Sequence, residues 1–496
     1  MTNPEFNLIE NGWIPIPGEH DPQSLREVFT RKELKGLAGN PVEKIVILRL
    51  LLAIAHAAVE LPDRKAWLAL TPEKLAKQCL AYLEQWHDRF NLYGEKPFLQ
   101  FPALAKGKLS TIAATQVSVA TGNKVVLTSW NVAQDCDDAG KVRVLLRQSC
   151  FGCSGKRYDQ DLSLASGLVK KSTGKSGTLT GFLGYLHSYL LGDTLLETLR
   201  NNLLCADEIA EFNVFSGGVG RPFWEEMPVS ENCRRAEELL STYQGQLFPL
   251  DKFLLLKDDG IVMTDGIAYP THKTGLADPA LTLWSDGKDG KALWCSTEKK
   301  PWRELVALLG FFDVQQGRKT PWLLYCGLAG LAKSDAGTRA FWTGGMRVSS
   351  NAGEQYLSGT DDYVESEFRI SVSDSMDTRF YAFRSMIEVL DDYAKRLYVA
   401  VSGYYRELQS VQGEIASGAV RKFWELLEQR SQGIIDLAFG EEAASDESIA
   451  AEQKHWQRIV FQIYNESCPN ITARQLTAWV KCTPNFKKKE GKKNGK

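Results

Sequence analysis

The most apolar stretch of the chain, residues 45–59, constrains the fold more than any other feature of the sequence. It contains Arg49 and His56, and it is shorter than the roughly 20 apolar residues that a membrane-spanning helix needs. Pro41 stands just ahead of it, which is a favourable residue for the first turn of a helix. We therefore predict a helix from Pro41 to about Glu60, buried inside a water-soluble protein.

The length and composition supply enough apolar residues to surround such a helix. Apolar residues make up 44% of the sequence and charged residues 24%, which is ordinary for a globular protein. A chain of 496 residues predicts two to four domains and excludes the disordered, collagen-like and disulfide-stapled classes. The ten cysteines are scattered from Cys79 to Cys482 and no signal peptide is recognisable, so we expect a reducing, cytoplasmic location.

Charge is nearly balanced over the whole chain but uneven along it. Fifty-nine Lys and Arg residues against 61 Asp and Glu residues give a formal charge of −2, which argues against a small free-standing nucleic-acid-binding protein. Residues 487–496 hold six lysines against one glutamate, a net +5 that leaves −7 for the rest of the chain. This tail is either a disordered, solubilising end or a nucleic-acid contact.

A second basic stretch spans residues 141–180, where eight basic residues stand against two acidic ones. The basic residues are Lys141, Arg143, Arg147, Lys156, Arg157, Lys170, Lys171 and Lys175. Composition leaves two interpretations open: a solvated face, or a loop whose last three lysines meet phosphate groups. In the second case Gly174 and Gly177 would let the backbone approach a nucleic-acid groove closely.

Local signals predict mixed secondary structure at the start of the chain. Residues 6–16 predict a short strand, a turn at Asn11-Gly12 and a second extended segment. Ser24 is placed to cap a short helix that ends near Thr30. Thr71-Pro72 opens another helix, in which apolar residues recur at a helical period.

The middle of the chain predicts both helices and strands. Residues 183–204 favour a helix, whereas residues 253–257 and 261–264 favour strands between Gly, Asp and Pro turns. We therefore assign residues 1–368 to one large mixed body, and the whole chain to the α+β class with some antiparallel strands.

The last part of the chain changes to a helical pattern. Apolar residues recur at helical spacing after about Ser375, and further helical patterns cover residues 410–438, 449–466 and 471–482. Four helices with short connections predict an antiparallel four-helix bundle over residues 369–486. Its aromatic stripe is interpreted as core, and the lysine tail at 487–496 is expected to be disordered.

No catalytic or metal-binding constellation stands out. The six histidines lie far apart, and no phosphate-binding loop, nucleophile elbow or metalloprotease motif is present. Cys150 and Cys153 have the spacing of half a zinc site, but the sequence contains no second such pair. Two interpretations stay open: both are ordinary thiols, or Cys136 or Cys205 helps to complete a zinc site in the folded chain. Residues 341–353 predict a turn rich in small polar residues.

An ordered series of motifs resembles the CasA-type large subunit of the type I-E CRISPR surveillance complex, Cascade. The series is Phe6-Asn7-Leu8-Ile9-Glu10-Asn11-Gly12-Trp13-Ile14-Pro15, Ser24-Leu25-Arg26-Glu27-Val28-Phe29, Leu37-Ala38-Gly39, Leu48-Arg49-Leu50-Leu51-Leu52-Ala53-Ile54, Arg89-Phe90-Asn91-Leu92 and Pro97-Phe98-Leu99-Gln100. Later landmarks are residues 266–279 and Gly344-Gly345-Met346-Arg347. Length and the predicted C-terminal helices agree, so the resemblance covers the whole chain and is densest over residues 6–101.

The resemblance implies a non-catalytic protein without a cofactor. Such subunits sit at the end of a guide-RNA complex that holds the RNA 5′ handle. They recognise the protospacer-adjacent motif in double-stranded DNA, help to open the duplex and recruit a separate helicase–nuclease. The implied partners are therefore the other Cascade subunits, guide RNA, target DNA and that effector, and no membrane.

In the family three elements read the motif from the minor groove: a glycine-rich loop, a lysine and a hairpin wedge with a glutamine at its tip. By resemblance the loop falls at residues 171–178, with Lys171, Gly174, Lys175 and Gly177, and the lysine is Lys273. The wedge follows Gly344, Gly345 and Arg347.

The tip of the wedge is expected within residues 349–352, where this sequence has Ser349, Ser350 and Asn351 and no glutamine. Asn351 can also hydrogen-bond base edges, so the departure bears on the motif preference. Trp130 and Asn131 match a loop that packs near the guide handle, with buried core as the alternative for Trp130.

Two rival functions remain from the residues alone. One is a cytoplasmic metabolic enzyme with an unrecognised carboxylate site, and the other is a non-CRISPR scaffold whose basic loop is only solvated.

Overall fold

The structure is a computed structural model of the chain. It describes residues 5–112, 115, 136–151, 184–212, 214–258, 260–270, 278–281, 283–285, 290–309, 337–347, 349–351, 354–356, 363–372, 376–410, 413–442 and 444–486. The chain forms two compact units. The mixed unit comprises Met1–Asp335 and Arg339–Glu367, and the helical unit comprises Ala336–Thr338 and Phe368–Lys496.

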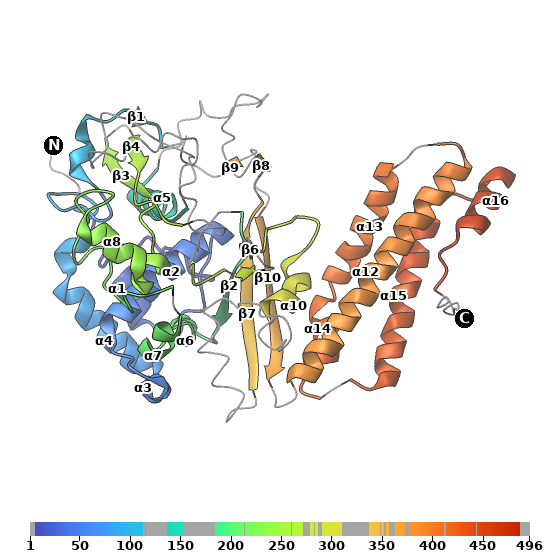
Figure 1. The fold of residues 1–496 in the computed structure, drawn as a ribbon, viewed down its shortest axis with the longest axis horizontal. Helices are drawn as coiled ribbons and strands as arrows, with labels where there is room; N and C mark the ends of the chain where they lie inside the picture. Colours follow the sequence, from blue (N-terminus) through green and yellow to red (C-terminus); the bar gives the residue numbers. More distant parts are fainter. Residues whose placement is uncertain are drawn as a thin grey trace, which may run out of the picture. The chain divides into compact units, whose positions relative to one another are not determined.

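The helices of the mixed unit are mostly short and surround one long helix, α2 (Figure 1). They are α1 (Leu25–Thr30), α2 (Pro41–Ala58), α3 (Arg64–Ala69), α4 (Pro72–Gln85), α5 (Asp138–Phe151), α6 (Leu195–Asn201), α7 (Ala206–Glu211), α8 (Arg234–Ser241), α9 (Tyr243–Leu247) and α10 (Leu305–Leu308). Their starts follow the sequence signals. Ser24 and Glu27 form a capping box on α1, and Thr71 caps α4 ahead of Pro72.

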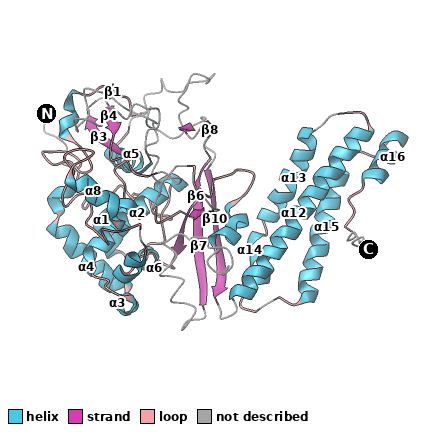
Figure 2. Ribbon diagram, viewed as in Figure 1, coloured by secondary structure: helices cyan, strands magenta, loops and turns pink. Residues whose placement is uncertain are grey.

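The strands form small sheets rather than one large layer (Figure 2). They are β1 (Leu109–Ser110), β2 (His187–Leu191), β3 (Lys252–Lys257), β4 (Gly260–Asp265), β5 (Leu283–Ser285), β6 (Gly290–Ala292), β7 (Gly337–Met346), β8 (Ser349–Asn351), β9 (Glu354–Tyr356) and β10 (Tyr363–Val372). Two sheets have three strands, in the orders β1-β4-β3 and β10-β7-β2, and β5-β6 and β8-β9 are two-stranded. The predicted strands at 253–257 and 261–264 are confirmed as the antiparallel pair β3 and β4.

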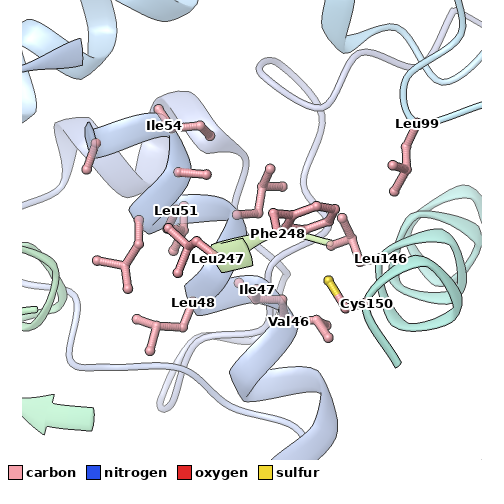
Figure 3. Close-up of a cluster of buried hydrophobic side chains, with 14 of the residues drawn as sticks. Val46, Ile47, Leu48, Leu51, Ile54, Leu99, Leu146, Cys150, Leu247 and Phe248 are labelled. Carbon is pink, nitrogen blue, oxygen red and sulfur yellow. The ribbon is translucent and has the colours of Figure 1, made fainter. Parts of the chain in front are cut away.

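Helix α2 lies at the centre of the hydrophobic core of the mixed unit, as the sequence predicts (Figure 3). Its N-terminus is capped by Asn40, and Pro41 occupies the first turn. Val46, Leu48 and Leu51 are fully buried on different sides of the helix, because neighbouring elements cover it all round. The Gln244 side chain of α9 donates to the Ala53 carbonyl at 3.0 Å, which ties α9 to this helix.

Two local predictions for the mixed unit are wrong. Residues 6–16 form no strands: Asn7 and Ile14 make isolated bridges, to Asn91 and Gln23, and the Asn11 side chain holds the turn by accepting from the Asn7 N–H at 2.8 Å. Residues 183–204 hold strand β2 and helix α6 rather than one helix, because a short apolar run has no period that separates a strand from a buried helix.

The helical unit contains five described helices rather than the four predicted. They are α12 (Met376–Glu407), α13 (Gly413–Glu428), α14 (Ser431–Phe439), α15 (Asp446–Ser467) and α16 (Ala473–Cys482). The long α12 contacts each of the other four. The segment expected as one helix at 410–438 breaks between α13 and α14. Leu427 and Ile434, seven residues apart on either side of the break, are both buried. The hydrophobic period therefore continues across the break and does not mark it.

The core of the helical unit follows the predicted stripe. Phe380, Phe383, Leu390 and Leu397 of α12 are all buried. The division into units falls between Glu367 and Phe368, and Ala336–Thr338 also belong to the helical unit. No helix in the described part of the chain is long and apolar enough to cross a membrane.

Candidate nucleic-acid interface

The predicted interface residues are divided between described and undescribed segments. Seven lie outside the described residues: Trp130, Asn131, Lys171, Gly174, Lys175, Gly177 and Lys273. The other six, Gly344, Gly345, Arg347, Ser349, Ser350 and Asn351, lie in or between β7 and β8. Arg347 is exposed, in the connection from β7 to β8.

Gly344 and Gly345 do not form the turn that the sequence predicts. Both are buried in strand β7, where Gly344 pairs with His187 of β2. A Cβ on Gly344 would lie 2.8 Å from the Val364 carbonyl oxygen, and one on Gly345 would lie 2.6 Å from that of Tyr185. Glycine is needed here because neighbouring backbone packs against the strand.

Strands β8 and β9 form the hairpin that the sequence predicts beyond β7. The register pairs Ser349 with Tyr356, Ser350 with Gln355 and Asn351 with Glu354. Ser349, Ser350 and Asn351 therefore lie in the first strand, and the chain joins the strands through residues 352 and 353. The second strand contains Gln355, which pairs with Ser350 and lies outside the range 349–352 in which the tip is expected.

Part of the basic stretch 141–180 is helical, and its first residues bond within the protein. The Lys141 ammonium donates to Tyr93 and Asp138, each at 2.9 Å. Arg143 donates to the Trp13 carbonyl at 3.1 Å. The fully buried Arg147 donates to the Thr115 carbonyl at 3.0 Å. These residues of α5 are therefore structural, and any phosphate-binding role falls to the later lysines.

A buried cluster lies at the first residue of β2, and we call it the β2 junction. It consists of Arg49 of α2, Phe151 of α5, Tyr185, His187 of β2 and Asp278. These residues come from four separate parts of the sequence, and at most 2% of each is exposed.

The charged pair of the junction is Arg49 and Asp278. The Arg49 guanidinium donates to one carboxylate oxygen of Asp278 through Nη2, and the other oxygen accepts from the Ala280 N–H at 3.0 Å. The guanidinium also lies 5.3 Å from the centre of the Phe151 ring. Its Nε and Nη1 atoms have no hydrogen-bond partner among the described residues.

His187 is the neutral member of the junction. Burial lowers the pKa of its imidazole to about 3, and the nearby Arg49 charge lowers it too, while Asp278 raises it. Its ring meets the Phe151 ring edge-on, with the centres 5.4 Å apart. It is therefore uncharged at neutral pH, and the Arg49–Asp278 pair is the charged contact of the junction.

Tyr185 links the junction to strand β7 and to Trp294. It forms a backbone bridge to Trp294, whose ring packs edge-on at 4.7 Å between centres and is 42% exposed. The Cys295 N–H donates to the Gly184 carbonyl at 2.8 Å, and its thiol donates to the Tyr185 carbonyl at 3.3 Å. The backbone of Gly345 packs against the same carbonyl.

The described ends of three predicted DNA-contacting segments meet at the β2 junction. Residues 152–183, which carry the glycine-rich loop, follow Phe151 and precede Gly184. Residues 271–277, which carry Lys273, precede Asp278. Strand β7 pairs with β2 and leads to the β8–β9 hairpin. The fold thus brings together segments that are far apart in the sequence.

Evidence for a zinc site is missing from the described residues. Cys150 is fully buried in the core against α2, and Cys153 lies outside the described part (Figure 3). The described residues contain no group of three or more His, Cys, Asp or Glu side chains placed to hold a metal ion.

Comparisons with known proteins agree with this architecture. The model of the CRISPR-associated protein Cse1 family matches residues 7–466. The CRISPR-associated protein CasA/Cse1 of Thermus thermophilus is 25% identical over 336 residues, which are 62% of this chain, and the match spans 60% of the relative's length.

Solved structures share the fold over almost the whole chain. Cse1 of Thermobifida fusca matches with a TM-score of 0.75 at 19% identity, over 97% of this chain and 98% of that one. A chain of a CRISPR RNA-guided surveillance complex matches with a TM-score of 0.71 at 17% identity, over 97% of this chain and 99% of that one. Because the family model spans most of the sequence, this chain belongs to the CRISPR-associated protein Cse1 family.

Proposed function

We propose that the chain is the DNA-recognition subunit of a Cascade-type, guide-RNA surveillance complex in antiviral defence. It reads the protospacer-adjacent motif in double-stranded target DNA, helps to open the duplex and recruits a separate helicase–nuclease. Base pairing with the guide reads the target sequence itself, as in other RNA-guided systems. Catalysis is assigned to the recruited effector and not to this chain.

The observation that carries the proposal is the meeting of three segments at the β2 junction. A protein that reads a short motif needs phosphate contacts for register and base contacts for identity in one place. The segment with Lys171 and Lys175 offers the first, and Lys273 and the β8–β9 hairpin offer the second. If the chain were a scaffold whose basic loop is only solvated, there would be no functional reason for these three segments to begin at the same place in the fold.

Family membership supports the coarser part of the proposal. One of the matched structures is a CRISPR RNA-guided surveillance complex, which favours assembly of this chain with guide RNA and other subunits. We assign Trp130 and Asn131 to the contact with the guide handle or a neighbouring subunit, following the resemblance in the sequence.

The hairpin is proposed as the wedge that enters beside the motif. Unstacking a base pair costs a few kcal/mol, and a polar strand end offsets part of this by hydrogen bonds to the exposed base edges. Ser350, Asn351 and Gln355 are the residues of β8 and β9 that we assign to this role.

Co-expression with the other subunits and guide RNA tests the proposal. We expect the chain to co-purify with the complex and to increase the affinity of the complex for duplex targets that carry the motif. Failure to co-purify, with the other subunits properly assembled, would favour a scaffold or metabolic role. Metal-dependent DNA cutting by the purified chain, abolished by a substitution within it, would contradict the non-catalytic assignment.

A further inference from the structure

We propose that Arg49 and Asp278 are a positioning pair that holds residues 278–281 against β2 and thereby fixes the origin of the DNA-reading segments. The inference rests on the proposed function of those segments. The pair itself lies wholly among described residues, so its structural effect can be measured without DNA.

The position of Arg49 is costly for a residue that only fills the core. Its side chain is 1% exposed and that of Asp278 is fully buried. Removing two charges from water costs free energy. A protein with apolar residues of similar size in place of a buried ion pair is often equally stable. The neighbouring buried positions of α2, Leu48 and Leu50, are filled by apolar residues. The charge therefore serves a purpose that an apolar side chain at position 49 would not serve.

The contacts of Asp278 indicate what that purpose is. One carboxylate oxygen binds Arg49 and the other accepts from the Ala280 N–H at 3.0 Å. The Ala280 carbonyl accepts from the Ser188 N–H of β2 at 2.9 Å, and Leu281 bridges to His187. One ion pair thus connects helix α2 to the edge of β2.

Strand β2 carries the connection onward to the hairpin. His187 pairs with Gly344, and the Ser188 and Thr343 hydroxyls are hydrogen-bonded at 2.8 Å. Both strand residues are buried, so a shift of β2 displaces β7 with it. The Arg49–Asp278 contact is a charge-assisted hydrogen bond through Nη2, which has a preferred direction, whereas an apolar contact between position 49 and position 278 would tolerate sliding. The pair is suited to fixing a register.

A double variant separates positioning from stability. Arg49→Met with Asp278→Asn removes both charges, so no unpaired charge remains buried, and the asparagine oxygen still accepts from the Ala280 N–H. The matched control is Leu51→Ala on the same helix, which leaves a cavity in the hydrophobic core shown in Figure 3 and keeps both charges of the pair.

Amide hydrogen exchange on the full-length free chain is the first measurement. In the double variant we expect exchange at Ser188, Ala280 and Leu281 to rise about tenfold or more, with α4 and α6 unchanged. In Leu51→Ala we expect the rise to spread over the mixed unit. Equal exchange in the double variant and wild type, or a rise spread as in Leu51→Ala, would overturn the positioning role.

Duplex opening by the assembled complex is the second measurement, made well below the unfolding temperature of each variant. We expect the double variant to open paired target about tenfold less than wild type, and Leu51→Ala to open it normally. If the double variant shows the local rise in exchange but opens paired target as well as wild type does, the positioning inference is overturned and the proposed function is not affected. If the wild-type chain makes no difference to opening, the proposed function fails, and the exchange experiment still decides the structural role.

Discussion

The mixed unit and the helical unit bury their side chains according to different rules. In the helical unit the core is an apolar stripe with local period, and Arg379 is the one described charged residue that is buried there. The mixed unit buries Arg49, Asp278 and the neutral His187 at the β2 junction, and a second neutral histidine, His56, further along α2. Regular packing maximises stability, whereas buried polar groups fix geometry at a cost. The unit that is proposed to read DNA is the one that accepts this cost.

The largest effect that distinguishes the units is the loss of a buried arginine. Arg49→Met leaves the Asp278 carboxylate buried and unpaired, and we expect the free energy of unfolding of the mixed unit to fall by about 3–5 kcal/mol. Arg379→Met removes hydrogen bonds to the carbonyls of Ser371, Gly440 and Glu441 and should cost the helical unit about 1–3 kcal/mol. Urea unfolding followed by exchange in each unit measures both, and equal losses would contradict the contrast.

The second effect is acid sensitivity of the mixed unit. Burial lowers the pKa of His56 and of His187 to about 3, against about 6.5 in the unfolded chain. Below pH 6.5 the unfolded state therefore binds two protons that the folded state does not, and stability falls as the pH drops toward 3.

Each of these histidines contributes up to about 1.4 kcal/mol per pH unit in that window. The check is the pH dependence of urea unfolding between pH 7 and 5, in wild type and in His56→Phe with His187→Phe. We expect a much flatter profile in the double variant. An unchanged slope would show that the histidines are protonated in the fold.

The third effect is that replacing a glycine by alanine should lower the stability of one unit and raise that of the other. Gly345→Ala would place a Cβ 2.5 Å from the Cys295 sulfur and 2.6 Å from the Tyr185 carbonyl oxygen, at a cost of about 1–3 kcal/mol. Gly433→Ala adds a methyl group where α14 has open space, and should gain about 0.5–1 kcal/mol. Thermal unfolding of the two variants measures the signs, and stabilisation by Gly345→Ala would refute the packing role.

The smallest effect concerns phosphate contacts of the mixed unit. Lys171→Ala with Lys175→Ala should weaken duplex binding by the complex similarly for all targets, and should lower the slope of log affinity against log salt by at most about two. The matched control is Lys395→Ala with Lys454→Ala, two exposed lysines of the helical unit. Identical salt slopes in the two double variants would show that residues 171–178 are only solvated.

Local sequence signals predicted what depends on neighbours in the chain. The sequence predicts four features correctly, because each depends on residue spacing within one element: the capped starts of α1 and α4, the burial of α2 and the apolar stripe of α12. The sequence does not predict the break between α13 and α14, since the buried positions continue across it.

The interface depended on contacts that no local pattern contains. Arg49 stood out in the apolar segment, but its partner Asp278 is 229 residues away. The sequence predicts a turn at Gly344 and Gly345, because a glycine pair has the same composition in a turn and in a crowded strand. Composition does not point to Gln355, because its place opposite Ser350 follows from the hairpin register. That register is set by strand pairing rather than by composition.

Permanganate mapping of unpaired thymines tests the central claim, that segments leaving the β2 junction recognise and open duplex DNA. The samples are the guide-RNA complex with wild-type chain, with Ser350→Ala, Asn351→Ala and Gln355→Ala combined, and without the chain, each on paired and pre-melted targets. We predict opening of paired target by wild type only, and rescue of the hairpin variant on pre-melted target, where the unstacking energy is already supplied. Paired target opened equally well by all three samples would contradict the account.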